Sequence, residues 1–448
     1  MKILHYSLGF PPYRTGGLTK YCIDLMHEQK KDGNDVALLW PGVVKDFSNE
    51  VKIKKRISVN GLSSYEIINP MPVSLLNGIK EVDKFVVEKN TKAFWTFLQK
   101  NKFDVIHIHT MMGLPKEFLE VAKELKVKTI FTSHDYFGIC PKVSLMYGDI
   151  NCRYDSKCLN CEFCNSTAMS TKNIKIKQSR IYRTIKSIKI INKFKKYKFK
   201  PKPITINQDE SETCAEKNLK NEEYVKLRSY YMKMLSLITK IHYNSSVTKE
   251  TYEEFMVKTP GKVISISNSV ISNHKKIKQF GDKVRIGYLG PASPRKGFFL
   301  LKDALDDLEK EYDGRFELHI YSQNCFDSKY IVAHKPYAYS ELDKVMDGID
   351  ILVLPSIWHE TFGFTVLEAQ SYGVPVVVSS NVGAKDLISE GNNGFIFEPN
   401  KEALKEKLKY IFDSDKTLLE KMNRYIIDKV EIKTMDAHAK EILNFYEE

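Results

Sequence analysis

Residues 349–380 read IDILVLPSIWHETFGFTVLEAQSYGVPVVVSS. Two short runs in it, ILVL at 351–354 and VPVVV at 374–378, are apolar at nearly every position and flank a stretch with glycine and two glutamates. Such strands are typical of a parallel sheet that helices cover on both faces. The stretch therefore predicts a strand, a helix that begins around Thr361 to Phe364, and a second strand of an α/β domain.

The same alternation continues on both sides of this stretch. From Lys283 onward, KVRIGYLG and FELHIYS predict strands, and FFLLKDALDDLEKEY between them predicts a helix. The N-terminal part repeats the pattern, with strands predicted at MKILHYS, DVALLW, DVIHIHT and VKTIFTSHD. Strands that alternate with helices indicate parallel sheets with crossover helices. We therefore expect an α/β protein with two tandem Rossmann-like, doubly wound domains that face a cleft.

The polar segment SNHKKIKQFGD at 272–282 marks the expected boundary between the two domains. We expect an N-terminal domain over 1–275 and a C-terminal domain over 276–425. The last segment, 426–448, is expected to be a helix that crosses back to the N-terminal domain. Within the N-terminal domain, a cysteine-rich stretch covers 140–164 and a basic helical segment covers 172–202.

The composition is that of a globular protein. The chain has 448 residues, of which 42% are hydrophobic and 28% are charged. It contains no run of about 18 apolar residues, which a membrane-spanning helix needs. The N-terminal MKILHYSLGFPP lacks the long apolar region and the small-residue cleavage site of a signal peptide, and it reads as a first strand. We therefore expect a cytoplasmic protein.

Glu360 and Glu368 follow the first strand of the quoted stretch, at the edge where ligands of such sheets bind. A hydrolase with paired carboxylates needs them about 5 to 9.5 Å apart, whereas eight helical positions separate the backbones by about 12 Å. A helix start with free amides at Phe362, Gly363 and Phe364 instead favours an anion. Carboxylates beside it suit the hydroxyls of a nucleotide sugar. In the alternative interpretation, Glu360 caps the helix and Glu368 is solvated.

The spacing E-TFGFTVL-E, followed by YGVPVV, resembles the signature of glycosyltransferase family 4, whose members are retaining enzymes with the two-domain GT-B fold. The resemblance extends along most of the chain. It includes PPYRTGGLTKYCIDL at 11–25, FDVIHIHT at 103–110, TIFTSHDYFGICP at 129–141, KPYAYSELDKVMDGIDILVLPS at 335–356 and GNNGFIFEP at 391–399. Together these matches are specific for the family, whereas each of them alone is weak.

The resemblance implies roles for the residues of the quoted stretch. Glu360 would be catalytic and would hold hydroxyls of the donor sugar. Glu368 would bind the ribose of the nucleotide. Phe362, Gly363 and Phe364 would offer backbone amides to the donor.

A second donor-binding loop is implied after the first strand of the C-terminal domain. The family usually has G-R-x5-K-G there, and Gly290 to Gly297 read GPASPRKG. Lys296 would grip the diphosphate, where positive charge stabilises the departing phosphate. Pro291 stands where an arginine is common, and Arg295 is its candidate replacement. The alternative for Arg295 and Lys296 is that they are solvated loop residues.

The N-terminal domain would contribute glycines and histidines. Gly16 and Gly17 end a loop and open a helix, where glycines permit close contact with a phosphate or with the acceptor. In the family, the histidine that matches His134 reaches the donor sugar, so we expect His134 to be catalytic. We expect His107 and His109 to face opposite sides of the sheet, with His109 toward the cleft. The alternatives are a plain turn and structural histidines.

Retaining transfer in this family needs neither an enzyme nucleophile nor a catalytic metal, because the acceptor hydroxyl attacks the face that the nucleotide leaves. We therefore predict a retaining hexosyltransferase that moves a sugar from a nucleotide-diphospho sugar to a saccharide or lipid-linked saccharide. Its role would be the synthesis of a surface polysaccharide or other glycoconjugate. The alternatives are a zinc-containing scaffold of the same fold that has lost catalysis, for which Pro291 argues, and a nucleotide-sugar epimerase or phosphorylase.

Five cysteines follow the pattern C-x11-C-x5-C-x2-C-x2-C, namely Cys140, Cys152, Cys158, Cys161 and Cys164. Tight C-x2-C spacing with outlying cysteines suits a structural zinc site, which takes four ligands. We therefore expect four of the five to be ligands, and the spacing does not decide which one is spare. The alternative is a loop with free thiols.

Thirteen lysines or arginines and no acidic residue lie between Lys172 and Lys202, and this segment accounts for the net charge of +13. From 180 to 200, basic residues and isoleucines recur every three or four positions on different faces, as in a basic amphipathic helix. Such a helix can lie on an anionic membrane surface, so we expect a peripheral protein at the inner face of the cell membrane. The alternatives are a core-packed helix with a solvated basic face, and nucleic-acid binding, for which no base-stacking motif argues.

Overall fold

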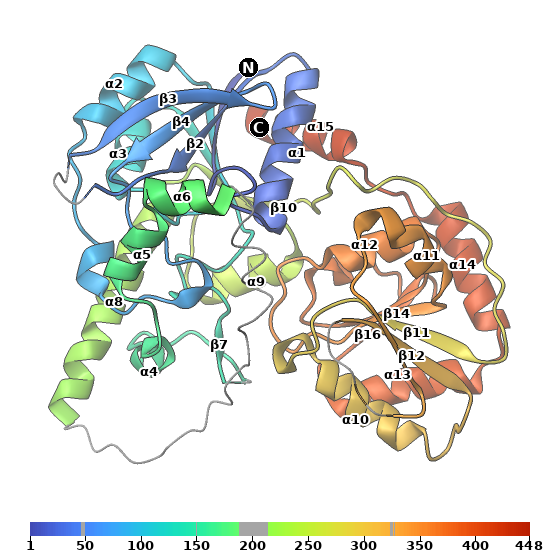
Figure 1. Ribbon diagram of the computed structural model, residues 1–448. Coiled ribbons are helices and arrows are strands. Elements are labelled where there is room, and N and C mark those ends of the chain that lie inside the picture. Colours follow the sequence, from blue (N-terminus) through green and yellow to red (C-terminus); the bar gives the residue numbers. More distant parts are fainter. Residues whose placement is uncertain (46–49, 149, 188–213, 323–325, 327) are drawn as a thin grey trace.

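The computed structural model describes residues 1–45, 50–148, 150–187, 214–322, 326 and 328–448. The chain forms two lobes, the first coloured blue to green and the second yellow to red in Figure 1. Each lobe is built around its own sheet. The expected architecture of two Rossmann-like α/β domains is therefore confirmed.

The sheet of the first domain has eight strands in the described residues. Their spatial order is β10 (Gly261–Val263), β9 (Lys240–Tyr243), β6 (Lys128–Thr132), β5 (Val105–Ile108), β1 (Lys2–Tyr6), β2 (Asp35–Pro41), β4 (Leu62–Ile68) and β3 (Lys52–Val59). All neighbours are parallel except β3 and β4. The order runs outward from β1 on both sides, as in a doubly wound sheet. A small antiparallel pair, β7 (Met146–Tyr147) and β8 (Ile150–Asn151), lies in the cysteine-rich stretch.

The sheet of the second domain has six strands in the described part of the chain, all parallel to their neighbours. Their order is β13 (Ile331–His334), β12 (Phe316–Tyr321), β11 (Val284–Tyr288), β14 (Ile351–Leu354), β15 (Val376–Ser379) and β16 (Gly394–Phe397). Every residue of β14 and β15 is buried. This burial explains why the two runs of the opening stretch are apolar throughout.

Helices cover both sheets (Figure 1). Those of the first domain are α1 (Gly17–Lys31), α2 (Lys92–Asn101), α3 (Lys116–Glu124), α4 (Cys161–Asn165), α5 (Thr171–Lys177), α6 (Arg180–Ser187), α8 (Cys214–Ser236) and α9 (Ser246–Glu254). Those that follow are α10 (Phe298–Leu308), α11 (Leu342–Asp347), α12 (Phe364–Ser371), α13 (Lys401–Asp413), α14 (Thr417–Lys429) and α15 (Met435–Glu447). None of the helices in the described ranges is both long enough and apolar enough to cross a membrane.

Short 3-10 helices connect several of these elements. They lie at Leu75–Asn77, Val82–Phe85, Pro294–Lys296, Tyr339–Glu341 and Gly383–Leu387. Two of them follow strands of the second sheet and carry residues of the site described below, Lys296 and Tyr339.

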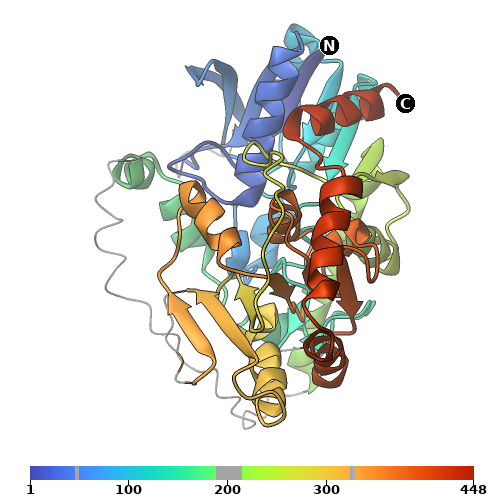
Figure 2. The ribbon, with the colours of Figure 1, turned by 90° about the vertical axis from the view of Figure 1, so that its right-hand side faces the viewer.

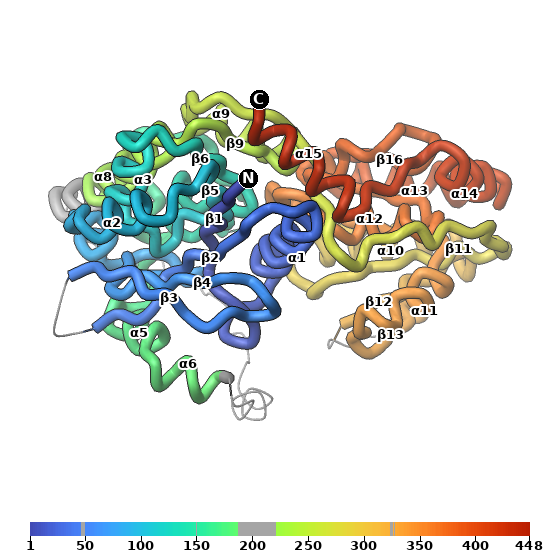
Figure 3. Tube along the Cα trace, turned by 90° about the horizontal axis from the view of Figure 1, so that it is seen from above, coloured from blue at the N-terminus to red at the C-terminus, as the bar shows by residue number. Residues whose placement is uncertain are grey.

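The last helix returns to the first domain and packs against α1 (Figures 2 and 3). Its buried Ile442 and Phe445 belong to one apolar cluster with Leu25 of α1 and Val366 of α12, so the two domains share a core. The preceding helix, α14, runs through residues 425 and 426. The chain therefore leaves the second domain only after Lys429, slightly later than the sequence suggests.

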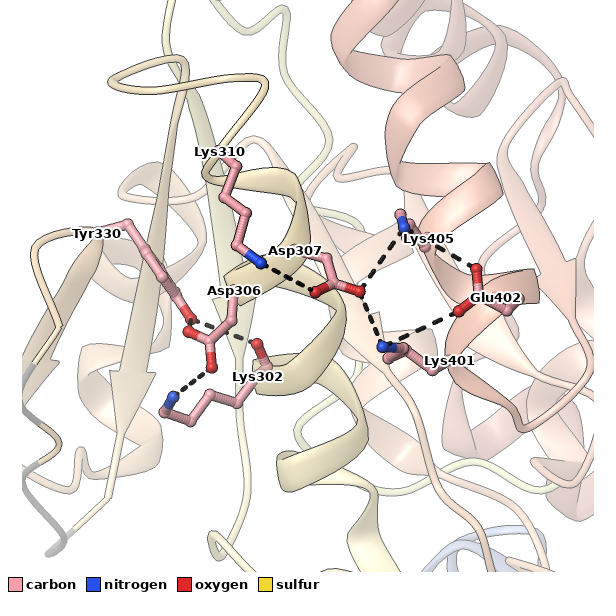
Figure 4. A network of polar contacts seen from close by, with 8 residues as sticks. All are labelled: Lys302, Asp306, Asp307, Lys310, Tyr330, Lys401, Glu402 and Lys405. Carbon is pink, nitrogen blue, oxygen red and sulfur yellow. Dashed lines mark hydrogen bonds and ion pairs between the residues drawn. The ribbon is translucent and has the colours of Figure 1, made fainter.

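The outer face of the second domain carries an exposed ionic network (Figure 4). Asp307 of α10 lies 2.8 Å from Lys401 and 3.6 Å from Lys405 of α13. Lys310 approaches the same carboxylate at 3.7 Å. Solvent screens contacts of this kind, so they contribute little to the packing of α10 against α13.

Candidate active site

The candidate site lies where the loops after the strands of the two sheets meet. His134 follows β6 of the first domain, and Glu360 follows β14 of the second. The hydroxyl of Thr361 donates to the backbone carbonyl of His134 at 3.2 Å. Ser245 of the first domain donates to the carbonyl of Thr361 at 2.7 Å. The structure thus brings together the loops of the two residues that the sequence predicts to be catalytic.

Glu360 forms an ion pair at the rim of the second domain. Its Oε1 lies 2.6 Å from Nζ of Lys296, and its Oε2 accepts a hydrogen bond from the hydroxyl of Ser356 at 2.7 Å. The side chains of Glu360 and Lys296 are only 14% and 20% exposed, so solvent screens the pair weakly. The ammonium of Lys296 can exchange this carboxylate for a phosphate oxygen, because both accept its N–H groups.

Trp358 lies beside two cations at this rim. The centre of its ring is 5.7 Å from the guanidinium of Arg295 and 5.2 Å from Nζ of Lys296, within the range of cation–π contacts. The amides of Ile357 and Trp358 donate to the carbonyl of Arg295, which ties the loop after β11 to the loop after β14. Trp358 is not among the residues that the sequence predicts, although its position two residues before Glu360 was a signal for it.

A helix start with free amides follows Glu360. Gly363 has a φ of 102°, and a Cβ there would lie 2.9 Å from Cγ1 of Val382, so the position needs glycine. In the described part of the chain, the amides of Phe362, Gly363 and Phe364 donate to no other residue. Free amides at the start of a helix attract an anion. The side chain of Phe362 is buried, so this residue offers only its backbone.

Three of the predicted glycines lie in loops with open space above the backbone. A Cβ on Gly16 or Gly17 would meet no atom within 4 Å, and one on Gly290 would approach only the side chain of Tyr288, whose hydroxyl would lie 3.9 Å away. Gly16 also has a φ of 119°, which favours glycine. A ligand can therefore approach the backbone closely at the start of α1 and at the end of β11.

Glu368 is buried rather than solvated, so that alternative is wrong. It is 2% exposed on α12, and this burial raises its pKa from 4.5 to about 7. Tyr339 donates a side-chain hydrogen bond to it, and the charge of Glu368 also acts on Tyr337. The two tyrosines are not among the predicted site residues. They precede Glu368 by about thirty positions, and nothing in their spacing connects them to it.

His134 is a half-buried, neutral histidine. Burial lowers its pKa from 6.5 to about 3. The ring of Tyr21 lies edge-on to it at 4.6 Å, and its Nε2 lies 3.3 Å from Nδ1 of His109. Near neutral pH, His134 can therefore form hydrogen bonds with hydroxyl groups of a ligand, but it offers no positive charge to a phosphate.

The expectation that His107 and His109 face opposite sides of the sheet is wrong. Their ring centres lie 4.2 Å apart, and both residues are fully buried. The physical reason is that residues two positions apart along a strand face the same side. His109 therefore lies behind His134 and is not itself exposed to a ligand.

The cysteine-rich stretch lies outside the rim residues described above. Four of its cysteines line a cavity of about 260 Å³, namely Cys140, Cys152, Cys158 and Cys161. The Sγ of Cys164 instead contacts the carbonyl of Met146 at 3.6 Å. Within the described residues, no three of these sulfurs lie within 4.8 Å of one another.

The basic segment is described as far as Ser187, and the rest of its predicted helix lies outside the described residues. In α6, Arg183 points inward to the buried Glu66, at 3.0 Å. Ile181 and Ile185 are 74% and 42% exposed. α6 does pack on the domain, through Tyr182, but the isoleucines face outward and Arg183 faces inward, so the expected solvated basic face is not found in this part. The buried carboxylate of Glu66 needs cations and draws the basic side chain inward.

Two family models match the chain, one in each domain. The model of Glycosyltransferase Family 4 matches residues 15–160, and that of Glycosyl transferases group 1 matches residues 270–429. An uncharacterized glycosyltransferase of Methanocaldococcus jannaschii is 24% identical over 100% of this chain and 98% of that protein. An uncharacterized 42.6 kDa protein in the cps region of Klebsiella pneumoniae is 26% identical over 66% of this chain, and the match spans 62% of that protein.

A solved glycosyltransferase-like structure shares the fold of this chain. Anabaena HepE, solved in complex with UDP, superposes with a TM-score of 0.55 over 100% of both chains at 14% identity. That likeness shows that the fold is GT-B, and the two family models show that the sequence also matches glycosyltransferases. The resemblance drawn from the E-x7-E stretch is thereby confirmed: the chain belongs to family 4 of the glycosyltransferases.

Proposed function

We propose that the protein transfers a sugar from a nucleotide-diphospho sugar to a hydroxyl of a saccharide or lipid-linked saccharide, with retention of the anomeric configuration. The observation that carries this proposal is the ion pair between Lys296 and Glu360. Glu360 directly precedes the free amides at the start of α12, and the neighbouring Thr361 contacts the loop of the neutral His134. Cations and amides suit a diphosphate. Carboxylates and a neutral imidazole suit the hydroxyls of sugars.

The donor is proposed to bind the second domain. Lys296, Arg295 and the amides at the start of α12 take the diphosphate, Glu360 takes hydroxyls of the sugar, and Glu368 takes the ribose. Anabaena HepE, which has the same fold, was solved with UDP, and this supports a nucleotide as part of the donor.

In the proposed reaction, the bond between the anomeric carbon and the diphosphate oxygen breaks. The acceptor oxygen bonds to the same face of that carbon, and its proton passes to the departing phosphate. Lys296 and Arg295 stabilise the negative charge that collects on the diphosphate. His134 forms a hydrogen bond with the sugar. The proposed reaction needs neither a nucleophile from the protein nor a catalytic metal.

Nucleotide release from a panel of uridine, guanosine and adenosine diphospho-sugars tests this proposal. We expect one donor to yield free nucleoside diphosphate, rapidly with a saccharide acceptor and slowly with water, and we expect NMR to show the donor's anomeric configuration in the product. Nucleotide binding without release from any donor would favour the scaffold. Conversion of the donor sugar without release would indicate an epimerase, and release that depends on inorganic phosphate would indicate a phosphorylase.

The outward face of α5 and α6 is proposed to contact an anionic membrane surface, where a lipid-linked acceptor would be found. Ile176, Ile181 and Ile185 are exposed along these helices. They border a groove of about 680 Å³ that Lys172 and Lys175 also line. Exposed isoleucines beside lysines favour the boundary between acyl chains and acidic headgroups. This contact would make the protein a peripheral one at the inner face of the membrane.

Co-sedimentation with lipid vesicles tests this contact. We expect the protein to bind vesicles that contain phosphatidylserine and not those of phosphatidylcholine alone. Exchange of Ile181 and Ile185 for glutamate should abolish binding. The matched control is Ile277→Glu, since Ile277 is 71% exposed in the segment between the two domains. Equal binding of the α6 variant and the control would contradict a membrane role for α6.

The cysteine-rich stretch is proposed to hold a structural zinc ion with four of its five thiols. The donor set fits zinc, because thiolates are its preferred structural ligands, and four of these cysteines line one cavity. Zinc would supply no chemistry to sugar transfer and would hold the loop. Metal analysis of the purified protein should find about one zinc per chain. Serine at Cys140 and Cys161 together should abolish it, whereas serine at the buried Cys22 of α1 should not.

A further inference from the structure

A chain of hydrogen bonds between buried side chains runs from His134 through the first domain. It passes first through His109, which follows β5, and ends on the backbone carbonyl of Ile264. Between them it passes through residues of β1, α1, α15, β5, β6 and β9, namely His5, Gln29, Tyr446, His107, Thr132 and His242. All seven linking residues are essentially buried. Within this chain, the direction of each hydrogen bond fixes the direction of the next.

The direction is set at the Ile264 end. A carbonyl oxygen only accepts, so Nε2 of His242 carries a proton and donates to Ile264 at 2.7 Å. The other nitrogen of a neutral His242 then accepts from the hydroxyl of Thr132 at 2.9 Å. Since that hydroxyl has one proton, its oxygen accepts from Nε2 of His107 at 2.6 Å.

The next hydrogen bonds involve the last helix, α15, and the first helix, α1. Nδ1 of His107 accepts from the hydroxyl of Tyr446 at 2.6 Å. The oxygen of Tyr446 in turn accepts from Nε2 of Gln29 at 3.1 Å. The amide of Gln29 is thereby oriented, and its Oε1 accepts from Nε2 of His5 at 2.7 Å.

The chain then reaches the site. With its proton on Nε2, His5 accepts through Nδ1 from Nε2 of His109 at 3.0 Å. His109 accepts through Nδ1 from Nε2 of His134 at 3.3 Å. A neutral His134 therefore carries its proton on Nε2 and keeps Nδ1 as an acceptor.

Burial supports this assignment. It lowers the pKa of His5 to about 4 and that of His107 and His109 well below 6.5, so the rings are neutral and each carries one proton.

A metal ion bound by these three histidines would be an alternative, because their nitrogens lie within 4.8 Å of one another. However, both ring nitrogens of all three already take part in the chain, which leaves no lone pair for a metal.

We propose that Gln29 and Tyr446 are positioning residues that act through His5 and His109 to hold His134 as its Nε2–H tautomer. His134 then offers Nδ1 as an acceptor to a hydroxyl of the bound sugar, an inference that rests on the proposed function. The link through Tyr446 means that α15, which follows the second domain in sequence, helps to orient a residue at the rim of the first.

Nitrogen-15 NMR of the whole protein with labelled histidine rings tests the assignment directly, because a protonated and a bare ring nitrogen differ in chemical shift and in coupling to hydrogen. We expect His5, His107, His109, His134 and His242 all to be Nε2–H tautomers from pH 6 to pH 8. A proton on Nδ1 of His134, or a mixture of its two tautomers, would overturn the proposal.

Variants of Gln29 test the route. In Gln29→Met, the acceptor for His5 is lost, so His134 should become a mixture of tautomers and kcat should fall about tenfold, as for one lost hydrogen bond. In Gln29→Glu, a carboxyl oxygen still accepts from His5, so the single tautomer and the kcat should return. Tyr446→Phe releases the amide of Gln29 and should show a smaller loss of the same kind. The control is Tyr410→Phe, at an exposed tyrosine of α13.

The two proposals fail in different ways. If the tautomers are as expected but no sugar nucleotide is turned over, the proposed function is wrong and the assignment stands. If turnover is found and Gln29→Met keeps both the tautomer and the kcat of the parent protein, the positioning role is wrong and the function stands. A variant that loses activity while its His134 signal is unchanged also contradicts the positioning role.

Discussion

The two rims of the candidate site differ in charge. The rim of the first domain has a neutral imidazole, because burial lowers the pKa of His134 to about 3, and the pKa of His109 behind it is also lowered by burial. The rim of the second domain has a cation and an anion, Lys296 and Glu360, in contact at 2.6 Å. In the proposed function, the charged rim of the second domain binds the diphosphate, and the neutral His134 of the first domain binds a hydroxyl group of the sugar.

The largest effect is expected when the charged rim loses its cation. Lys296→Ala removes the cation nearest to the proposed diphosphate, so kcat/KM for sugar transfer should fall by about 10²–10³-fold. The control is Lys302→Ala, which removes a partly exposed lysine of α10 that pairs with Asp306. Steady-state kinetics with the preferred donor measures both. Similar kinetics for the two variants would mean that the second rim does not bind the phosphates.

The next effect tests the neutral rim. His134→Ala removes one hydrogen bond to the sugar, so kcat should fall about 10- to 100-fold, less than for Lys296→Ala. Because the pKa of His134 lies near 3, it stays neutral above pH 5, and the pH profile of kcat should show no step from this histidine. A step near pH 6.5 in the parent protein that disappears in His134→Ala would show that the rim is charged after all.

A third effect concerns the ribose site, where Glu368 has a pKa of about 7 in the free protein. Ribose hydroxyls that donate to Glu368 favour its ionised form, so nucleotide binding should release a proton. Affinity should therefore rise with pH by up to about tenfold per pH unit below pH 7 and level off above it. Calorimetry in buffers of different ionisation enthalpy measures the proton, and Glu368→Gln should bind without this dependence.

The same carboxyl affects stability with a defined sign. Its pKa is higher in the folded chain than the usual 4.5, so the stability that it contributes is complete below about pH 4.5 and is lost as the pH rises through about 7. The parent should therefore lose stability relative to Glu368→Gln as the pH rises. The difference in their free energies of unfolding should change by up to ~3 kcal/mol between pH 5 and pH 8. Denaturant unfolding at both pH values checks this. An unchanged difference would mean that Glu368 is not buried as described.

The smallest effect is expected far from both rims. Asp307→Asn disrupts the exposed network between α10 and α13 in Figure 4, which solvent already screens. Transfer should be unchanged, and the melting temperature should move by no more than about 1 °C. A larger change would mean that charge on the outer face of the second domain matters as much as charge at its rim.

Much of the fold was predictable because buried parallel strands are apolar throughout. The strands at 351–354 and 376–379 lie where the opening stretch places them. The pairing of Glu360 with Lys296 was not predictable, since it joins two loops that are 64 positions apart. The contact between Gln29 and Tyr446 joins residues 417 positions apart, and it forms because α15 packs back against α1 of the first domain. The inward turn of Arg183 depends on Glu66, whose complete burial cannot be read from its neighbours in sequence.

The place of α15 has a consequence for building hybrids of such enzymes. An exchange of donor specificity between relatives would ordinarily cut the gene once, between the domains, and take everything downstream from the second parent. Here that cut separates Tyr446 from the histidine and glutamine that it contacts. A hybrid that keeps residues 435–447 from the parent of its N-terminal half preserves those contacts, so the gene should be joined at two places rather than one.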